Sequence, residues 1–184
     1  LYLREYPNSD KAYDVHYSYG ELLYKLKDFG GAYEQYMAVV ALDANGKHSK
    51  FCAESAIFAA EEQVKQEGGG NASGKKTADA KKNIEPQDLT TWEQRLVTAC
   101  KQYADLYPND SKVRNAIYKS AYLLYNKYRF AEAGEQFKAI IAREPTSNQA
   151  QLSADLMLDS FVVREDWSNL KSNSKFYYDL EGLG

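Results

Sequence analysis

Two residues at helical spacing carry side chains that could do chemistry. His48 and Cys52 stand four positions apart, so on a helix they share one face. A Cys–His nucleophile pair needs that proximity, and both groups can bind a metal. A metal site needs three or four ligands, however, and a catalytic pair needs an orienting group and a pocket. Nothing else in the sequence supplies these, so we expect no catalytic site, no metal and no cofactor here.

A second set of reactive side chains is acidic. Asp155 and Asp159 share a helix face, and so do Glu54 and Glu61, with Glu62 beside them. Paired carboxylates can act as general acid and base. On helical proteins they more often form a solvated acidic surface. We therefore expect a protein that is not an enzyme.

The chain holds two cysteines, Cys52 and Cys100. A disulfide between them would close a long loop and would indicate an oxidising compartment. Register counting on antiparallel helices puts Cys100 nearer to residue 56 than to Cys52. The favoured interpretation is two reduced, buried residues, with a disulfide as the alternative.

The elements that position these residues are repeated. Residues 6–57 aligned without gaps on residues 107–158 give 15 identities in 52 positions, where chance would give about three. Self-similarity on this scale predicts a stacked-repeat architecture. The identical pairs include Tyr6/Tyr107, Pro7/Pro108, Asn8/Asn109, Tyr17/Tyr118, Leu22/Leu123, Leu23/Leu124, Tyr24/Tyr125 and Phe29/Phe130.

Hydrophobic spacing predicts the helices of the first copy at about 11–26, 29–43 and 48–65. A further helix is expected after the Thr90 or Thr91 cap, running through Leu106 to Pro108, another over 148–164, and a last one from Asp166-Trp167. Capping residues precede several of them: Ser9 or Asp10, Asp28, Thr90 and Thr91 with Glu93 and Gln94 three positions on, and Thr146 or Ser147. The apolar positions expected in the first three helices are Val15, Tyr19, Leu22, Leu23 and Leu26, then Ala32, Tyr36, Val39 and Val40, then Phe51, Ala53, Ile57, Phe58 and Val64.

Residues 67–85 interrupt the helical pattern. They are rich in Gly, Ala and Lys and carry almost nothing to bury, so we expect a flexible, disordered insert inside a repeat. Asn71-Ala72-Ser73 fits the glycosylation sequon, a short pattern that often arises by chance. Four lysines of the insert could touch an acidic partner, although a solvated linker is the favoured interpretation.

Bulk composition excludes several classes of protein. The 184 residues fit a single domain over 1–184, and a net charge of −3 gives no electrostatic footprint for nucleic acid. No apolar run reaches the roughly 18 residues of a membrane span. The opening LYLREYP is typical of the last turn of a helix, so we expect a segment of a longer protein whose compartment signals lie elsewhere.

The repeat resembles the tetratricopeptide-repeat family over nearly the whole chain. A helix pair with its turns takes 34–37 residues, which fits the family's period. Three further features match the family's pattern. Each copy has a small residue (Gly20, Ala121), an Ala twelve positions later and an aromatic residue four positions after that. The Tyr-Pro-Asn lead-in looks most like the bacterial envelope branch, which includes outer-membrane lipoproteins and periplasmic proteins. The departures are the absent Trp in the first helix, Ala44 in place of Pro145, and a poor match after Trp167.

The resemblance implies an α-solenoid of about four antiparallel helix pairs whose first helices line a concave groove. Such a tyrosine-lined, acid-flanked groove suits an extended or helical peptide with basic and apolar or proline residues. The alternative is that the tyrosines pack on neighbouring helices and another helix fills the groove. The implied groove positions are Tyr17, Glu21, Tyr24, Lys25, Glu54, Glu61, Tyr118, Tyr122, Tyr125, Asn126, Asp155 and Asp159.

The function that this implies is a non-catalytic scaffold or adaptor for protein–protein interaction, in the periplasm or cell envelope of a bacterium. Binding of envelope glycan or peptidoglycan is the alternative, because tyrosines can stack on sugar rings. An enzyme is the second alternative, which the lack of a complete site disfavours. The partners expected are proteins or peptides, without nucleic acid and without a membrane span.

Overall fold

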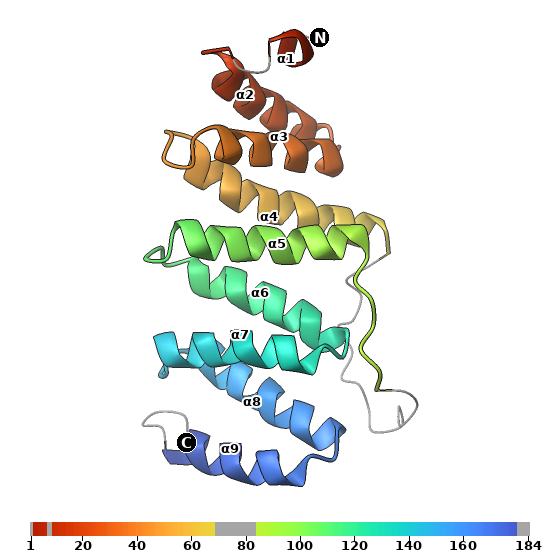
Figure 1. The fold of residues 1–184 in the computed structure, drawn as a ribbon, viewed down its shortest axis with the longest axis vertical. Helices are drawn as coiled ribbons and strands as arrows, with labels where there is room; N and C mark the ends of the chain where they lie inside the picture. Colours follow the sequence, from red (N-terminus) through yellow and green to blue (C-terminus); the bar gives the residue numbers. More distant parts are fainter. Residues whose placement is uncertain (1, 7–8, 69–83, 180–184) are drawn as a thin grey trace. The chain divides into compact units, whose positions relative to one another are not determined.

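The computed structural model describes residues 2–6, 9–68 and 84–179. All regular structure in these ranges is helical, and consecutive helices pack in pairs as in an α-solenoid (Figure 1). The predicted all-α fold class is thereby confirmed. In the same ranges no helix is long and apolar enough to cross a membrane. Most of the predicted insert at 67–85 lies outside the described residues.

The chain divides into two compact units, Leu1–Asn71 with Thr90–Asp110, and Ala72–Leu89 with Ser111–Gly184. The division at residues 110 and 111 falls just after the Tyr107-Pro108-Asn109 lead-in of the second sequence copy. The expectation of a single domain over residues 1–184 stays a prediction.

Unit 1 contains five helices in its described part, and each packs on the next in the chain (Figure 1). The short α1 is followed by two helix pairs, α2 with α3 and α4 with α5. Their bounds are α1 Tyr2–Glu5, α2 Ala12–Lys25, α3 Phe29–Leu42, α4 Ser49–Gln66 and α5 Thr91–Leu106.

Unit 2 follows the same plan with two helix pairs, and α6 also contacts α8. The backbone N–H of Gln87, in the segment that precedes α5, donates a hydrogen bond to the carbonyl oxygen of Lys127 at 2.8 Å. The bounds are α6 Val113–Asn126, α7 Phe130–Arg143, α8 Asn148–Val163 and α9 Trp167–Asp179.

Local capping explains several helix starts. Asp28 accepts from Gly31 N, and Ser147 accepts from Ala150 N, as predicted. Thr90 and Glu93 form the predicted capping box, in which each side chain accepts from the other residue's backbone N–H. The prediction failed at α2, where the cap position is Lys11 rather than Ser9 or Asp10 and its side chain makes no capping hydrogen bond.

Close packing of α2 on α3 depends on a glycine. A Cβ at Gly20 would lie 2.9 Å from two ring atoms of Tyr36, closer than carbon atoms approach. Gly20 therefore lets the buried Tyr36 ring lie against the α2 backbone, as the sequence predicted for a small residue here. Ala121, its counterpart in α6, is likewise fully buried.

Five of the expected core positions are exposed instead. On α2, Leu22 and Leu26 are 52% and 68% exposed, and Tyr19 is exposed as well. On α4, Phe51 and Phe58 are 47% and 44% exposed. Helical spacing could not separate these positions from the core, because α2 and α4 each carry apolar residues on more than one face. The remaining apolar positions named for these helices are buried or half-buried.

Candidate functional site

Contacts between α2 and α4 follow a fixed spacing. Asp14 lies near His48 and Tyr17 lies against Phe51, each 34 positions further on. The same spacing returns in unit 2, where Gln149 Nε2 donates to Asn115 Oδ1 at 3.0 Å and the Tyr125 hydroxyl donates to Asp159. The first helices of successive pairs therefore lie side by side in a common register, which brings the predicted residues together within each unit.

In unit 1 the result is a run of aromatic rings between α2 and α4. The Tyr17 ring stacks on His48 with centroids 3.8 Å apart and planes 3° apart. Phe51 meets Tyr17 edge-on at 6.0 Å and the buried Tyr36 at 6.5 Å. Tyr24 lies 6.4 Å from the same Tyr36 ring. The predicted Tyr17 and Tyr24 are thus half-buried members of a packed cluster, each with some surface left exposed.

Glu21 is tied into this cluster by a short hydrogen bond. The Tyr36 hydroxyl, which reaches α2 from α3, donates to Glu21 Oε1 at 2.6 Å. Burial, followed by this hydrogen bond to a carboxylate, raises the pKa of Tyr36 well above its usual range. Burial and the Glu21 charge likewise raise the pKa of Tyr17. Glu21 therefore acts as a fixed acceptor that holds both helices of the first pair.

Further carboxylates lie along α4. Lys65 Nζ lies 2.7 Å from Glu62 Oε1 and 3.7 Å from Glu61 Oε1, so it bridges two acids at the end of the helix. Burial and then the charge of Glu62 raise the pKa of Tyr24. Lys25 is exposed, and Glu54 is half-buried. That the predicted unit 1 residues form one binding groove stays a prediction.

Sequence reasoning missed Phe51 and Phe58 as surface residues. They stand seven apart on α4, so both rings lie on one helix face, with Glu54 and Glu61 three positions after each. The 34-residue spacing could have found them, because it pairs Phe51 with Tyr17 and Phe58 with Tyr24. We name this the α2–α4 face, and it comprises Tyr17, Glu21, Tyr24, Lys25, Phe51, Glu54, Phe58, Glu61, Glu62 and Lys65.

Unit 2 presents a comparable but more polar surface. Tyr118 and Tyr122 stack at 6.1 Å, and Tyr125 donates to the exposed Asp159. Burial and then this hydrogen bond raise the pKa of Tyr125 well above its usual range. Leu152, the counterpart of Phe51, is 41% exposed. The α6–α8 face comprises Tyr118, Tyr122, Tyr125, Asn126, Leu152, Asp155 and Asp159.

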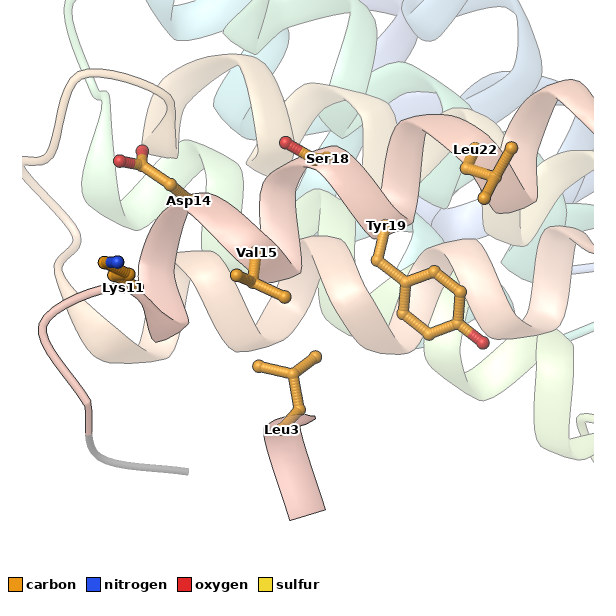
Figure 2. Close-up of a pocket in the computed structure, with 7 residues that line it drawn as sticks. All are labelled: Leu3, Lys11, Asp14, Val15, Ser18, Tyr19 and Leu22. Carbon is orange, nitrogen blue, oxygen red and sulfur yellow. The ribbon is translucent and has the colours of Figure 1, made fainter. Parts of the chain in front are cut away.

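A cleft of about 870 Å³ lies between α1 and α2. Figure 2 shows Leu3 of α1 pointing across it toward Val15, with Tyr19 and Leu22 further along α2. The rim carries Lys11 and Asp14. None of the twelve predicted groove residues lines this cleft, and its exposed Leu22 makes it a useful control surface.

Among the residues that the structure describes, His48 and Cys52 belong to no group of side chains suited to a metal ion. His48 stacks on Tyr17, and its Nε2 lies 3.8 Å from Asp14. Cys52 and Cys100 are not joined in a disulfide, and both are fully buried. No group of three or more His, Cys, Asp or Glu side chains suited to a metal occurs among the described residues.

The buried thiols give a testable prediction. Burial, and then the Glu21 charge, raises the pKa of Cys52 to about 12, so its thiol stays protonated and unreactive near neutral pH. We expect a disulfide-exchange reagent to modify the native protein slowly and to titrate two thiols after denaturation without reductant. Fast labelling of the native protein, or fewer than two thiols after denaturation, would contradict the buried, reduced state.

Comparisons with known proteins add no assignment to this geometry. No protein-family model matches the chain, and no curated protein is significantly similar to it.

Proposed function

We propose that the protein is a non-catalytic scaffold that binds a protein partner through the α2–α4 face. The proposal includes membership of the tetratricopeptide-repeat family and a place in a bacterial envelope complex, which rest on the sequence resemblance. The 34-residue spacing of contacts in both units supports the family proposal, because that is the family's repeat length.

One observation carries the binding proposal. Phe51 and Phe58 leave nearly half of each ring exposed on a helix whose other apolar residues are buried. Exposed apolar groups gathered in a patch with a polar rim mark interaction surfaces. Here the Phe51 ring is held in place by Tyr17 and Tyr36, so at this anchor a partner would meet a preorganised surface and lose little of its binding free energy to ordering.

The experiment is a crosslinking pull-down from the native source with three versions of the chain. The first is wild type, the second carries Phe51→Ser and Phe58→Ser, and the third carries Leu22→Ser and Leu26→Ser. Both variants remove two exposed apolar side chains. The first pair belongs to the α2–α4 face, and the second comprises Leu22, which lines the cleft, and Leu26, the C-cap residue of α2. Circular dichroism first establishes that each variant keeps its helical content.

We expect wild type and the leucine variant to recover the same protein and the phenylalanine variant to lose it. Aromatic anchors at the centre of an interface contribute most of its binding free energy, so the loss should be at least tenfold. Recovery of that protein by the phenylalanine variant would refute binding through this face. Loss only in the leucine variant would move the site to the cleft.

A further inference from the structure

We infer that the partner of the α2–α4 face is a positively charged protein segment that presents two apolar side chains about 10 Å apart. This inference rests on the proposed function and adds the chemistry of the ligand. It assigns Phe51 and Phe58 as the apolar anchors and the carboxylates around them as the groups that select a basic partner.

The spacing of the anchors follows from helix geometry. Phe51 and Phe58 are seven residues apart on α4, which at 1.5 Å per residue separates them by about 10.5 Å along the helix axis. A partner helix matches this distance with residues seven apart, and a polyproline II segment nearly matches it with residues three apart, at about 9.3 Å. Two apolar side chains at this distance can each contact one ring.

The charge of the face favours a basic partner. Four carboxylates belong to it, Glu21, Glu54, Glu61 and Glu62, against the ammonium groups of Lys25 and Lys65, which leaves a formal charge of −2. Lys50, also on α4, is engaged in an ion pair with Asp110 and does not change this balance. Complementary charge speeds association and rejects partners of the same sign, so an acidic segment with the same apolar groups would be disfavoured.

The carboxylates also stand where a partner between the anchors would meet them. Glu54 follows Phe51 by three residues and precedes Phe58 by four, so its side chain emerges beside the gap between the two rings. Glu21 approaches from α2, where the Tyr36 hydroxyl fixes its position. A lysine or arginine between the two anchors of the partner would therefore have carboxylates on both sides.

Unit 2 repeats this combination with different residues. Its α8 carries the exposed Leu152 at the position of Phe51, followed by Asp155 and Asp159 at the positions of Glu54 and Phe58. An apolar residue followed by an acidic one is thus preserved where the two copies otherwise differ. Asp159 replaces the second anchor, so the α6–α8 face would select a partner by its positive charge and would offer it less apolar surface.

The test uses a phage-displayed library of random short peptides, selected in parallel on the whole immobilised chain and on the Phe51→Ser, Phe58→Ser variant. The selected sequences should carry net positive charge and two apolar residues at the spacing above. A synthetic copy of a selected peptide is then titrated by fluorescence anisotropy at low and high salt. We expect its affinity to fall at least tenfold at high salt, to fall about tenfold with Glu54→Gln and Glu61→Gln, and to stay unchanged with Leu22→Ser and Leu26→Ser.

The outcomes separate this inference from the function on which it rests. Enrichment of neutral or acidic peptides that still need Phe51 and Phe58 would overturn the basic partner and leave the binding face standing. Basic peptides that bind the phenylalanine variant equally well would overturn the assignment of the anchors. If the wild-type chain enriches no peptide over the variant, both this inference and the peptide-binding role of the face fail.

Discussion

Replacing Tyr36 with alanine should lower the free energy of unfolding of unit 1 by about 3–5 kcal/mol, the cost of emptying a large aromatic site in a core. The Tyr36 ring is 1% exposed, fills the space over Gly20 and supports both Phe51 and Tyr24. Removal of the ring takes away the buried side chain on which Phe51 and Tyr24 of the α2–α4 face pack. We therefore expect binding through that face to weaken together with stability.

Urea unfolding measures this loss of stability most directly when the fluorescence of a single tryptophan follows the unfolding of unit 1. Trp92 of α5 belongs to unit 1, while Trp167 of α9 is largely exposed in unit 2. A Trp167→Phe background therefore leaves Trp92 fluorescence as a probe of unit 1. The matched control is Tyr36→Phe, which removes only the hydroxyl that donates to Glu21 and should cost about 1 kcal/mol. Equal losses for the two variants would contradict the assigned packing role.

Alkaline pH should lower the free energy of unfolding, because the buried tyrosines lose their protons more readily in the unfolded state. Burial and hydrogen bonds to carboxylates raise the pKa of Tyr36 and of Tyr103, which donates to Asp110 at 3.0 Å. A raised pKa means that the native state holds the proton after the unfolded state has lost it. The stability from this source is complete below about pH 10 and is lost as the pH rises toward the native values.

For each of these two phenols the expected slope is about 1.4 kcal/mol per pH unit above pH 10. Urea unfolding at about pH 9 and about pH 11, with tyrosinate absorbance recorded on the same samples, measures it. The double variant Tyr36→Phe, Tyr103→Phe should be less stable at the lower pH and show a shallower dependence on pH. An unchanged dependence in the double variant would show that these phenols do not titrate with unfolding.

The repeat carried most of what the sequence could predict. Fifteen identities between the copies fixed which segments are equivalent, and glycine and capping residues marked where helices approach or begin. These features are local or depend only on sequence spacing, so they can be recognised without knowledge of the tertiary packing. The helix pairs, the close contact at Gly20 and the caps at Asp28, Thr90 and Ser147 follow from them.

The sequence could not tell which apolar face of a first helix is covered. Leu22 and Phe51 have the residue types of a core and lie at helical spacing from residues that are buried, yet both are exposed. Exposure depends on which helices pack on α2 and α4, and that is a property of the tertiary structure. Tyr17 and Tyr24 are half-buried, because ring contacts with their neighbours take up part of their surface.

The hydrogen bond between Tyr36 and Glu21 shows how the copies diverged in a coupled way. In the second copy Phe137 replaces Tyr36 and Tyr122 replaces Glu21, so the hydroxyl and its acceptor are absent together. In unit 1 the carboxylate of Glu21 supplies the acceptor that the buried Tyr36 hydroxyl needs. In unit 2 Phe137 has no hydroxyl, so no acceptor is needed and Tyr122 stands at that position. Fold and surface charge are therefore linked at this position.

The central claim is that the α2–α4 face contacts a protein partner. Ser55 lies on α4 between Phe51 and Phe58, one turn from each, so a photoreactive phenylalanine analogue at position 55 would stand within the face. The same analogue at position 22 would stand on the cleft side of α2. Irradiation in the native source should give a crosslinked adduct from position 55 and none from position 22. An adduct from position 22 alone, or none from either, would contradict binding through this face.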